Sequence, residues 1–264
     1  MWIPDPRFEN PGLLVPNRAP IGDVVIDQSN PFGRGLIRCW IPRMGVYLRD
    51  NAGPGYIYDL TGSGIVLRNQ ETIPSRDIEL KIEGEAPTIW PKSGGSFEGQ
   101  VQGASINNAI DLTADIVNFS ADDAWTVITR MTQTEYDVSN TYRYIIGGSN
   151  GDFAWNRSGV FVRVKGTNES KDLPSLGVVS NQRFITHGVS LTGGGAGNSI
   201  LRGYQHENQA FEEAASGMDS TFSTQFRTAN YSKGQQFCMV WNRAFTETEF
   251  QAFCANPYQV LIPA

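Results

Sequence analysis

Segment 237–261 constrains the fold of this chain more than any other, because it encodes a strand, a turn and a short helix in direct succession. The expected strand is apolar on both faces: Phe237, Met239 and Trp241 lie on one, Cys238 and Val240 on the other. A strand needs apolar residues on both faces only where both faces are covered. The pattern therefore predicts the central strand of a sheet.

The helix expected after this strand has a defined start, a buried side and a stop. Thr246 and Glu249 have the spacing of a capping box, in which each side chain satisfies a backbone N–H of the other residue. The Asn256-Pro257 pair ends the helix, since proline cannot continue one. The segment thus predicts one short amphipathic helix that packs on a sheet through three aromatic residues, Phe245, Phe250 and Phe253.

The rest of the chain has the composition of a β-protein with many turns. It contains 28 Gly and 14 Pro and only 18% charged residues. Short apolar runs bounded by Gly, Asn, Asp or Ser recur along it, without a long helical period or a polar linker between two cores. We therefore expect one antiparallel β-sandwich over residues 32–264, with Trp40, Trp125 and Trp241 in its core.

Four short segments resemble one family of proteins. They are segments 26–40 (IDQSNPFGRGLIRCW), 58–64 (YDLTGSG), 240–245 (VWNRAF) and 256–258 (NPY). In content and order they are similar to the opening, a turn and the closing element of laminin-G-like, concanavalin A-type jelly-roll domains that tailed bacteriophages and prophages encode. The resemblance brackets nearly the whole sandwich. It implies an all-β, concanavalin A-like/laminin-G-like antiparallel jelly roll with one short C-terminal helix.

The same resemblance implies a structural protein of a tailed-phage virion, assembled in the host cytoplasm, and it favours a capsid decoration (cement) protein. The expected partners are other virion proteins, either the major capsid protein or tail proteins, together with further copies of the chain in a homo-oligomer. The alternatives are a tail, baseplate or fibre component and a carbohydrate-binding module that acts in host adsorption. A fold shared by lectins, glycosidases and virion proteins does not decide among them.

Residues 1–31 depart from the β pattern, and we expect them to form an extended arm. Six of the fourteen prolines lie there, at positions 4, 6, 11, 16, 20 and 31, and proline blocks both helices and central strands. Apolar side chains on an arm without its own core must lie against something, either this sandwich or a neighbouring chain. We expect partner binding through six of them: Trp2, Ile3, Phe8, Leu13, Leu14 and Val15.

Charge and hydropathy argue against two classes of partner. The net charge is −6 with acidic and basic residues interspersed, so the concentrated positive field that nucleic-acid binding requires is missing. The sequence has no run of about eighteen apolar residues and no signal-peptide pattern, so we expect neither membrane insertion nor secretion. The cysteines are three in number and widely spaced, at 39, 238 and 254, which favours reduced thiols in the core.

A pair of glycosidase carboxylates is the first catalytic arrangement to test. Asp77, Glu79 and Glu83 alternate along an expected strand, as the carboxylates of concanavalin A-type glycosidases do. Lys81 stands where a further acid belongs, and Trp90 is the only aromatic residue expected to flank the run. An amphipathic strand with a charged outer face explains this run better than an active site does.

Nucleophilic catalysis through serine or cysteine would require a histidine base. The chain has only two histidines, His187 and His206, and neither lies in a recognisable motif. We expect His187 in a strand and His206 in a turn. Together with the interrupted carboxylate run, this predicts that the protein is not an enzyme.

Calcium is the remaining cofactor to consider. Members of the resembled class often hold Ca²⁺ with oxygen donors on loops at the rim of the sandwich. Their usual acidic segment is not recognisable at 96–103, so we expect no cofactor. If calcium binds, its ligands would come from the one dense cluster of oxygen donors: Asp111, Asp115, Asn118, Asp122 and Asp123.

Glycan binding would depend on exposed tryptophans, because their large rings can stack on sugars. Trp90, Trp125 and Trp155 are the candidates, although Trp125 alternates with Val127 and is expected in the core. An exposed row of tryptophans would favour a carbohydrate-binding module, whereas burial of all six would favour a structural role.

Overall fold

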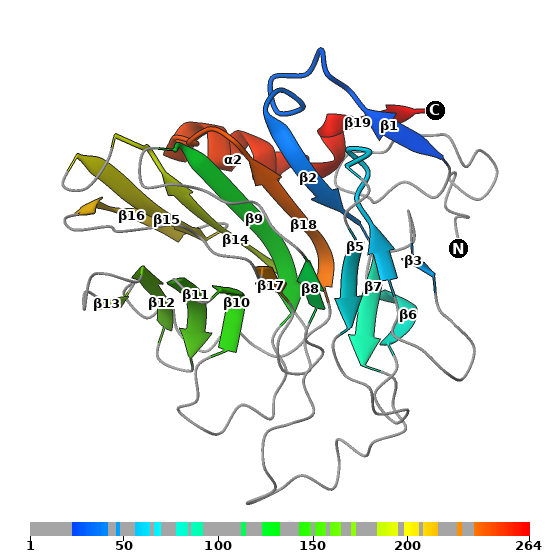
Figure 1. Cartoon of the computed structure of the whole chain (residues 1–264), viewed down its shortest axis with the longest axis horizontal. Coiled ribbons are helices and arrows are strands. Elements are labelled where there is room, and N and C mark those ends of the chain that lie inside the picture. The colour runs from blue at the N-terminus through cyan, green and yellow to red at the C-terminus, as the bar shows by residue number, and fades with distance from the viewer. Residues whose placement is uncertain are drawn as a thin grey trace, which may run out of the picture.

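The structure is a computed structural model of the chain, composed mainly of antiparallel strands (Figure 1). It describes residues 23–41, 46–47, 56–63, 66–69, 78–83, 86–91, 112–114, 123–132, 143–148, 151–156, 159–164, 170–172, 184–194, 198–205, 208–215, 226–228 and 235–264. Side chains are described within 23–41, 59–63, 123–130, 186–194, 198–204 and 236–264. Over these ranges the structure contains no helix with the length and apolarity to cross a membrane.

The larger part of the described core is built on an eight-stranded antiparallel sheet. Its strand order is β16-β15-β14-β9-β18-β7-β6, and β2 also pairs with β18. The strands are β2 (Leu36–Trp40), β6 (Ile78–Glu83), β7 (Ala86–Pro91), β9 (Trp125–Thr132), β14 (Phe184–Leu191), β15 (Ser199–Gln205), β16 (Asn208–Ala215) and β18 (Gln235–Trp241).

A second, nine-stranded antiparallel sheet has the order β13-β12-β11-β10-β17-β8-β5-β4-β3. Figure 1 shows β10–β13 on one side of the eight-stranded sheet and the closing helix on the other. The strands are β3 (Val46–Tyr47), β4 (Tyr56–Tyr58), β5 (Val66–Asn69), β8 (Leu112–Ala114), β10 (Arg143–Gly148), β11 (Gly151–Asn156), β12 (Gly159–Val164), β13 (Ser170–Asp172) and β17 (Phe226–Thr228).

β18 is a central strand, as its apolar pattern predicts. It pairs with β9 along one edge and with β2 and β7 along the other. We call the sheet face that carries Phe237, Met239 and Trp241 the outer face, and the face that carries Cys238 and Val240 the inner face. All five side chains are buried. Burial of each large apolar side chain contributes about 1.5–3 kcal/mol, so this strand is a main source of stability.

Helix α2 (Glu247–Ala255) packs on the outer face. The Thr246 hydroxyl accepts a hydrogen bond from the Glu249 backbone N–H at 3.2 Å, and the Glu249 carboxylate accepts one from the Thr246 N–H at 2.9 Å, which completes a capping box. Phe250 and Phe253 are fully buried beneath the helix. Gly188 in β14 permits this packing, because a Cβ there would lie 2.7 Å from the Phe250 ring.

The two ends of the described chain lie side by side (Figure 1). β1 (Val24–Ile26) pairs antiparallel with β19 (Leu261–Pro263), and the 3₁₀-helix η3 (Pro257–Val260) leads from α2 into β19. The Asp27 N–H donates to the Val260 carbonyl at 2.8 Å. Residues 23–31, the described part of the expected arm, are therefore bonded to the C-terminal segment. The expected domain boundary at residue 31 stays a prediction.

Candidate functional site

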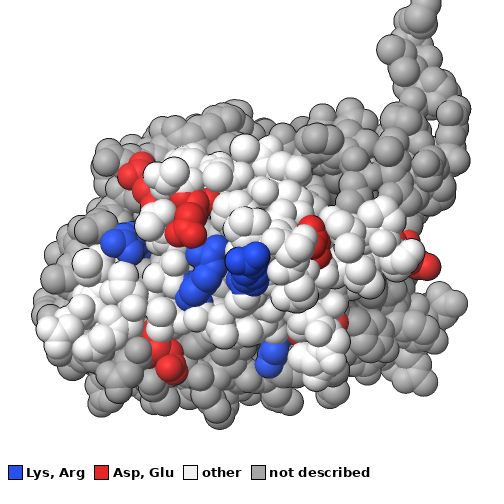
Figure 2. Space-filling model, turned by 90° about the horizontal axis from the view of Figure 1, so that it is seen from above, with Lys and Arg blue, Asp and Glu red and all other residues white. Residues whose placement is uncertain are grey.

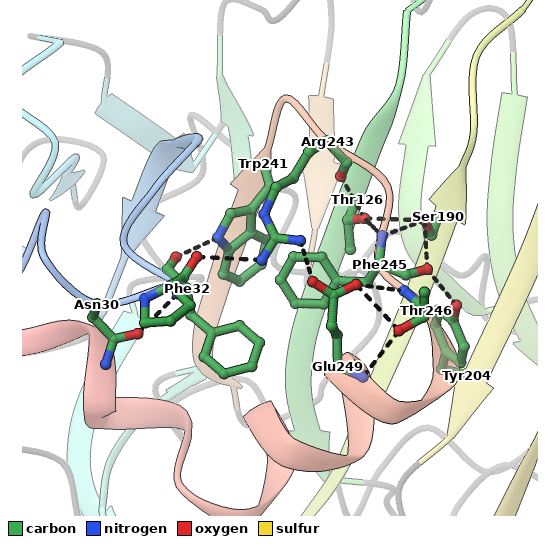
Figure 3. Close-up of polar contacts among 11 residues, drawn as sticks. Asn30, Phe32, Thr126, Ser190, Tyr204, Trp241, Arg243, Phe245, Thr246 and Glu249 are labelled. Carbon is green, nitrogen blue, oxygen red and sulfur yellow. Dashed lines mark hydrogen bonds and ion pairs between the residues drawn. The ribbon is translucent and has the colours of Figure 1, made fainter.

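The lead-in turn at residues 27–35 meets the closing segment on the outer side of the sheet, and we call this contact the chain-end junction (Figure 3). The Trp241 indole Nε1 donates a 2.6 Å hydrogen bond to the Phe32 carbonyl. Asn30 connects in two directions: its Oδ1 accepts from the Phe32 N–H at 2.8 Å, and its Nδ2 donates to the Gln259 carbonyl at 2.9 Å. The junction thus joins both ends of the sequence.

Arg243 is held from three sides at this junction. Nη1 forms a 2.6 Å ion pair with Glu249 Oε1, and Nη2 donates to the Pro31 carbonyl at 3.3 Å. The guanidinium carbon lies 4.3 Å from the centre of the Phe245 ring, a cation–π distance. Partial burial raises the pKa of Glu249, but the Thr246 N–H and the guanidinium lower it by more, so this pKa lies below its usual range.

Two buried hydroxyls fix the backbone where the closing turn enters the helix. The Phe245 N–H donates to Thr126 Oγ1 and Ser190 Oγ, each at 2.9 Å. The Phe245 carbonyl accepts from the Tyr204 hydroxyl at 2.6 Å. Thr126 also donates to the Arg243 carbonyl at 2.8 Å. These groups satisfy one another inside the fold, as buried polar groups must.

The Asp59 carboxylate holds the turn at 58–64 against β2. Its Oδ1 accepts from the Cys39 N–H at 2.7 Å and from the Thr61 N–H at 3.0 Å. Its Oδ2 accepts from the Thr61 hydroxyl at 2.7 Å and from the Ser63 hydroxyl, and Arg38 Nε lies 3.8 Å away. The similarity of segment 58–64 to a turn does not predict a role for Asp59. The signal for that role is a carboxylate followed by hydroxyls two and four residues later.

The hydroxyls and thiols near the junction are not arranged for nucleophilic catalysis. Ser190 and His187 lie in the same strand, but their odd spacing places them on opposite faces of the sheet. All three cysteines are buried reduced thiols. Burial raises the pKa of Cys254 to about 12 and that of Cys39 well above its usual value, so both sulfurs are neutral and poor nucleophiles.

The expected carboxylate run forms strand β6, which pairs with β7. Glu79 is in register with Trp90, Lys81 with Thr88, and Glu83 with Ala86. Alternation along the strand keeps Glu79, Lys81 and Glu83 on one face. Asp77 lies outside the described residues. The structure therefore places Trp90 directly across from Glu79, which the sequence alone did not specify.

The structure describes the other expected functional residues only in part. Asp123 is exposed. The remaining candidate calcium ligands and the arm residues lie outside the described residues: Asp111, Asp115, Asn118, Asp122, Trp2, Ile3, Phe8, Leu13, Leu14 and Val15. No three His, Cys, Asp or Glu residues within the described ranges are grouped to hold a metal ion. The expectations about calcium and the arm stay predictions.

The aromatic residues expected in the core are all buried. Trp90 and Trp155 lie in β7 and β11 respectively, and Trp2 and His206 lie outside the described residues. Because Trp125 is buried, it does not contribute to an exposed tryptophan surface on which a sugar could stack. The buried aromatic residues are Trp40, Trp125, Trp241, Phe245, Phe250 and Phe253.

Charges are mixed over the face that carries the chain-end junction. Figure 2 shows basic side chains near the centre of this face, with acidic side chains on either side of them. Neither sign forms a continuous patch over the described part of this face. A polyphosphate would meet attraction and repulsion in turn there, which agrees with the interspersed charges of the sequence.

Comparisons with known proteins find matches in structure alone, because no family model and no curated protein matches the sequence. The binding domain of Paraclostridial Mosquitocidal Protein 1 matches with a TM-score of 0.57 at 12% identity, covering 85% of this chain and 52% of that chain. The botulinum neurotoxin serotype D binding domain matches with 0.53 at 8% identity, covering 83% and 51%. The binding domain of botulinum neurotoxin DC in complex with SialylT gives 0.53 at 7% identity, also covering 83% and 51%.

Matches at such low identity establish the fold. The chain is a concanavalin A-like jelly roll, mostly antiparallel sheet with one short C-terminal helix, and this confirms the fold class expected from the sequence. The chain spans about half the length of the solved structures it matches. These matches carry no information about a phage origin.

Proposed function

We propose that this chain is a non-enzymatic binding module that recognises a carbohydrate receptor. The observation that carries the proposal is the shared fold: the matched structures are binding domains of a mosquitocidal protein and of botulinum neurotoxins, one of them in complex with SialylT. A fold hosts many functions, so the proposal also needs support from the residues of this chain.

That support comes from how the best-described polar groups are used. Arg243, Asp59 and Ser190 each bond to groups of their own chain and hold turns or the closing helix in place. Catalysis needs an acid, a base or a nucleophile that can meet a substrate. The motif residues of this chain build the scaffold instead, which favours recognition on a sheet face or loops over a reaction.

We further propose that the module belongs to a tailed-phage particle, as a tail, baseplate or fibre component that contacts the host. The four segments that resemble phage jelly-roll domains support this setting. Two of them, 26–40 and 240–245, meet in the chain-end junction, and 58–64 is tied to β2 through Asp59. Tyr258 of the fourth segment belongs to the same buried cluster as Phe32 and Trp241. Segments far apart in sequence thus pack together, as expected for the opening and closing elements of one domain.

A capsid decoration protein is the second candidate for the position in the particle. The proline-rich segment 1–22, with the six apolar residues that we expect to bind a partner, favours it, because a stiff segment with apolar anchors can dock on a neighbouring subunit at a low cost in entropy. Mass spectrometry of purified particles separates the two positions. Hundreds of copies per particle would identify a shell protein, and a handful would identify a tail component.

The binding function is tested with the full chain on a glycan array and on host cells, alongside a reducing-sugar assay on the polysaccharides that it retains. We expect saturable retention and no release of reducing ends. Retention on no glycan and no cell surface would overturn the binding module. Release of reducing sugar that is lost in Glu79→Gln would overturn the non-enzymatic proposal, because hydrolysis needs a carboxylate pair.

A further inference from the structure

The two-stranded sheet of β1 and β19, which we call the chain-end ribbon, carries an exposed apolar pair (Figure 1). Val25 is 46% exposed and Ile262 is 42% exposed, whereas the other large apolar side chains that the structure describes are buried or partly buried. The register pairs these two residues directly, so they share one side of the ribbon. Their neighbours Val24 and Ile26 pack against the core. The exposed pair therefore lies on the side of the ribbon that faces away from the core.

Hydrogen bonding leaves one edge of β1 open within the described part of the chain. The ladder with β19 is bonded at both of its ends, through the Asp27 N–H and the Asp23 carbonyl. Bonds in an antiparallel ladder recur at every second residue, so Val25 directs its N–H and C=O toward β19. The N–H and C=O groups of Val24 and Ile26 point to the other edge. No described residue bonds to the backbone there.

The two edges of the ribbon differ in their protection against further strands. Pro263 pairs with Val24, so it lies at a position where β19 also turns its backbone outward. Proline has no N–H, and it blocks strand addition at an edge. β1 has the sequence Val-Val-Ile, without proline or lysine. β1 is therefore the edge of the ribbon at which another strand can add.

Charge opposes the pairing of β1 with the same strand of a second copy. An antiparallel register that uses every outward backbone group places Val25 opposite Val25 of the second copy, and hence Asp23 opposite Asp27 of that copy. Hydrogen bonds from the Ser29 hydroxyl and N–H hold the pKa of Asp27 below its usual value, so its carboxylate is charged at neutral pH. Asp23 is exposed. Like charges directly opposite each other destabilise a strand pair, so the edge favours a strand with the opposite charge.

We propose that β1 binds an extended strand of a partner protein, in which an apolar residue has Lys or Arg two residues before it and two residues after it. Antiparallel addition places the apolar residue opposite Val25. The two cations then face Asp23 and Asp27, because residues two apart share a side of a strand. Backbone hydrogen bonds along the open edge supply affinity, and the side chains supply specificity. This surface goes beyond glycan recognition, since it attaches the module to another protein.

The test measures binding of cyclic β-hairpin peptides to the full chain by fluorescence anisotropy, because a preformed strand avoids the entropy cost of ordering a free peptide. The first peptide presents Lys-Thr-Val-Thr-Lys on one strand, and the second presents Glu-Thr-Val-Thr-Glu. We expect the basic peptide to bind at least about tenfold more tightly than the acidic one. A third peptide repeats the basic sequence with N-methylated threonines. It lacks the N–H donors to β1 and should bind at least about tenfold more weakly than the first.

Two variants of the chain test the site from the other side. Val24→Pro removes an N–H that the ladder with β19 does not use, so the ribbon keeps its own bonds while the open edge loses a donor. We expect at least about tenfold weaker binding of the basic peptide. Asp23→Lys should reduce the preference for the basic over the acidic peptide at least about tenfold. If Val24→Pro does not fold by circular dichroism, Asp23→Lys and the N-methylated peptide decide.

An exposed acidic residue outside the ribbon supplies the matched control. Glu247 lies in the first turn of α2. Glu247→Gln lowers the negative charge of the chain by one unit, and it should keep the affinity for the basic peptide within about twofold. A loss as large as that of Asp23→Lys would show that only the net charge attracts the peptide, and it would overturn the site.

The remaining outcomes identify other occupants of the edge. Equal binding of the basic and acidic peptides, or binding unchanged in folded Val24→Pro, would overturn the proposal. Self-association of the wild-type chain that Val24→Pro abolishes, measured by light scattering, would identify a second copy as the occupant instead. Peptide binding that appears only after deletion of residues 1–22 would show that this segment of the same chain occupies the edge. Each of these results leaves the glycan-binding function standing, because that function is measured separately on the glycan array.

Discussion

The indole of Trp241 donates a 2.6 Å hydrogen bond to the carbonyl of Phe32, across a sequence separation of 209 residues. The same two residues belong to one aromatic cluster: the rings of Phe245 and Phe253 lie 4.8 and 5.2 Å from the Trp241 ring and 5.6 Å each from the Phe32 ring. This buried hydrogen bond links the entry of the sandwich to its central strand β18. The N-terminal lead-in is therefore part of the folding unit.

Two truncations should behave differently because of this contact. Residues 1–22 form the part of the expected arm to which we assign partner binding rather than the core, so we expect their deletion to keep the melting temperature within about 2 °C. Deletion of residues 1–30 removes β1 and the Asn30 bonds to Phe32 and Gln259, so we expect a loss of several degrees. Equal melting temperatures for both truncations would show that β1 adds no stability.

The shorter truncation also tests the arm as a partner-binding segment. We expect the chain without residues 1–22 to lose incorporation into particles or self-association, measured by mass spectrometry and light scattering, while it keeps its fold. The expectation rests on stiff prolines and apolar anchors in that segment. Unchanged incorporation and unchanged oligomers would move the attachment surface to the sandwich.

Asp59→Ala should be among the most destabilising single changes in the turn at 58–64. It leaves the buried Cys39 N–H and the partly buried Thr61 N–H without an acceptor and Arg38 without its counter-ion, at a cost of about 3–5 kcal/mol. Asp59→Asn keeps an acceptor oxygen for both N–H groups, so we expect about 1–2 kcal/mol. Urea titrations measure both.

A partly exposed aspartate, Asp27, provides the control for these variants. Asp27 accepts hydrogen bonds from the Ser29 N–H at 2.9 Å and hydroxyl at 2.6 Å in an open turn. Asp27→Asn should change the free energy of unfolding by no more than about 0.5 kcal/mol, as surface changes do. Equal effects of Asp27→Asn and Asp59→Asn would contradict the structural role of Asp59.

The sequence predicted what local periodicity can encode. The two apolar faces of β18, the Thr246–Glu249 cap and the Phe250 and Phe253 contacts all follow from spacing within about ten residues. Strand β19 did not follow from it, because its partner β1 lies at the other end of the chain. The Asp59 bonds to β2 were missed for the same reason, since they join residues 20 apart.

The β6–β7 hairpin shows the same division. Alternation places Glu79, Lys81 and Glu83 on one side of a strand, and this needs only the sequence. The position of Trp90 across from Glu79 depends on the register of the hairpin, which the alternation of one strand does not specify. Such pairings are set by the whole sheet, and no single segment encodes them.

Gly188→Ala should destabilise the protein by about 1–3 kcal/mol, because the added methyl group would meet the Phe250 ring at 2.7 Å. Phe250→Ala should cost about 3–5 kcal/mol through the cavity it leaves. In the double variant Gly188→Ala/Phe250→Ala the clash is relieved, so we expect less loss than the sum of the two single changes. Strict additivity in thermal melts would show that the helix does not contact β14 at this point.

The charge on Glu249 should make the stability of the closing helix depend on pH. Its folded pKa lies below the usual value of 4.5, because hydrogen bonds from Thr246 and the Arg243 ion pair outweigh its desolvation. A lowered folded pKa adds stability that is fully present above about pH 4.5 and is lost as the pH falls through the folded pKa.

The variant Glu249→Gln isolates this effect, because it keeps a capping acceptor but carries no charge. We therefore expect the wild-type chain to melt higher than this variant near pH 7, with the difference shrinking below about pH 4.5 as Glu249 takes up its proton. Parallel melting curves for the two chains down to about pH 3 would show that the Arg243–Glu249 pair contributes nothing measurable, as holds for many exposed pairs.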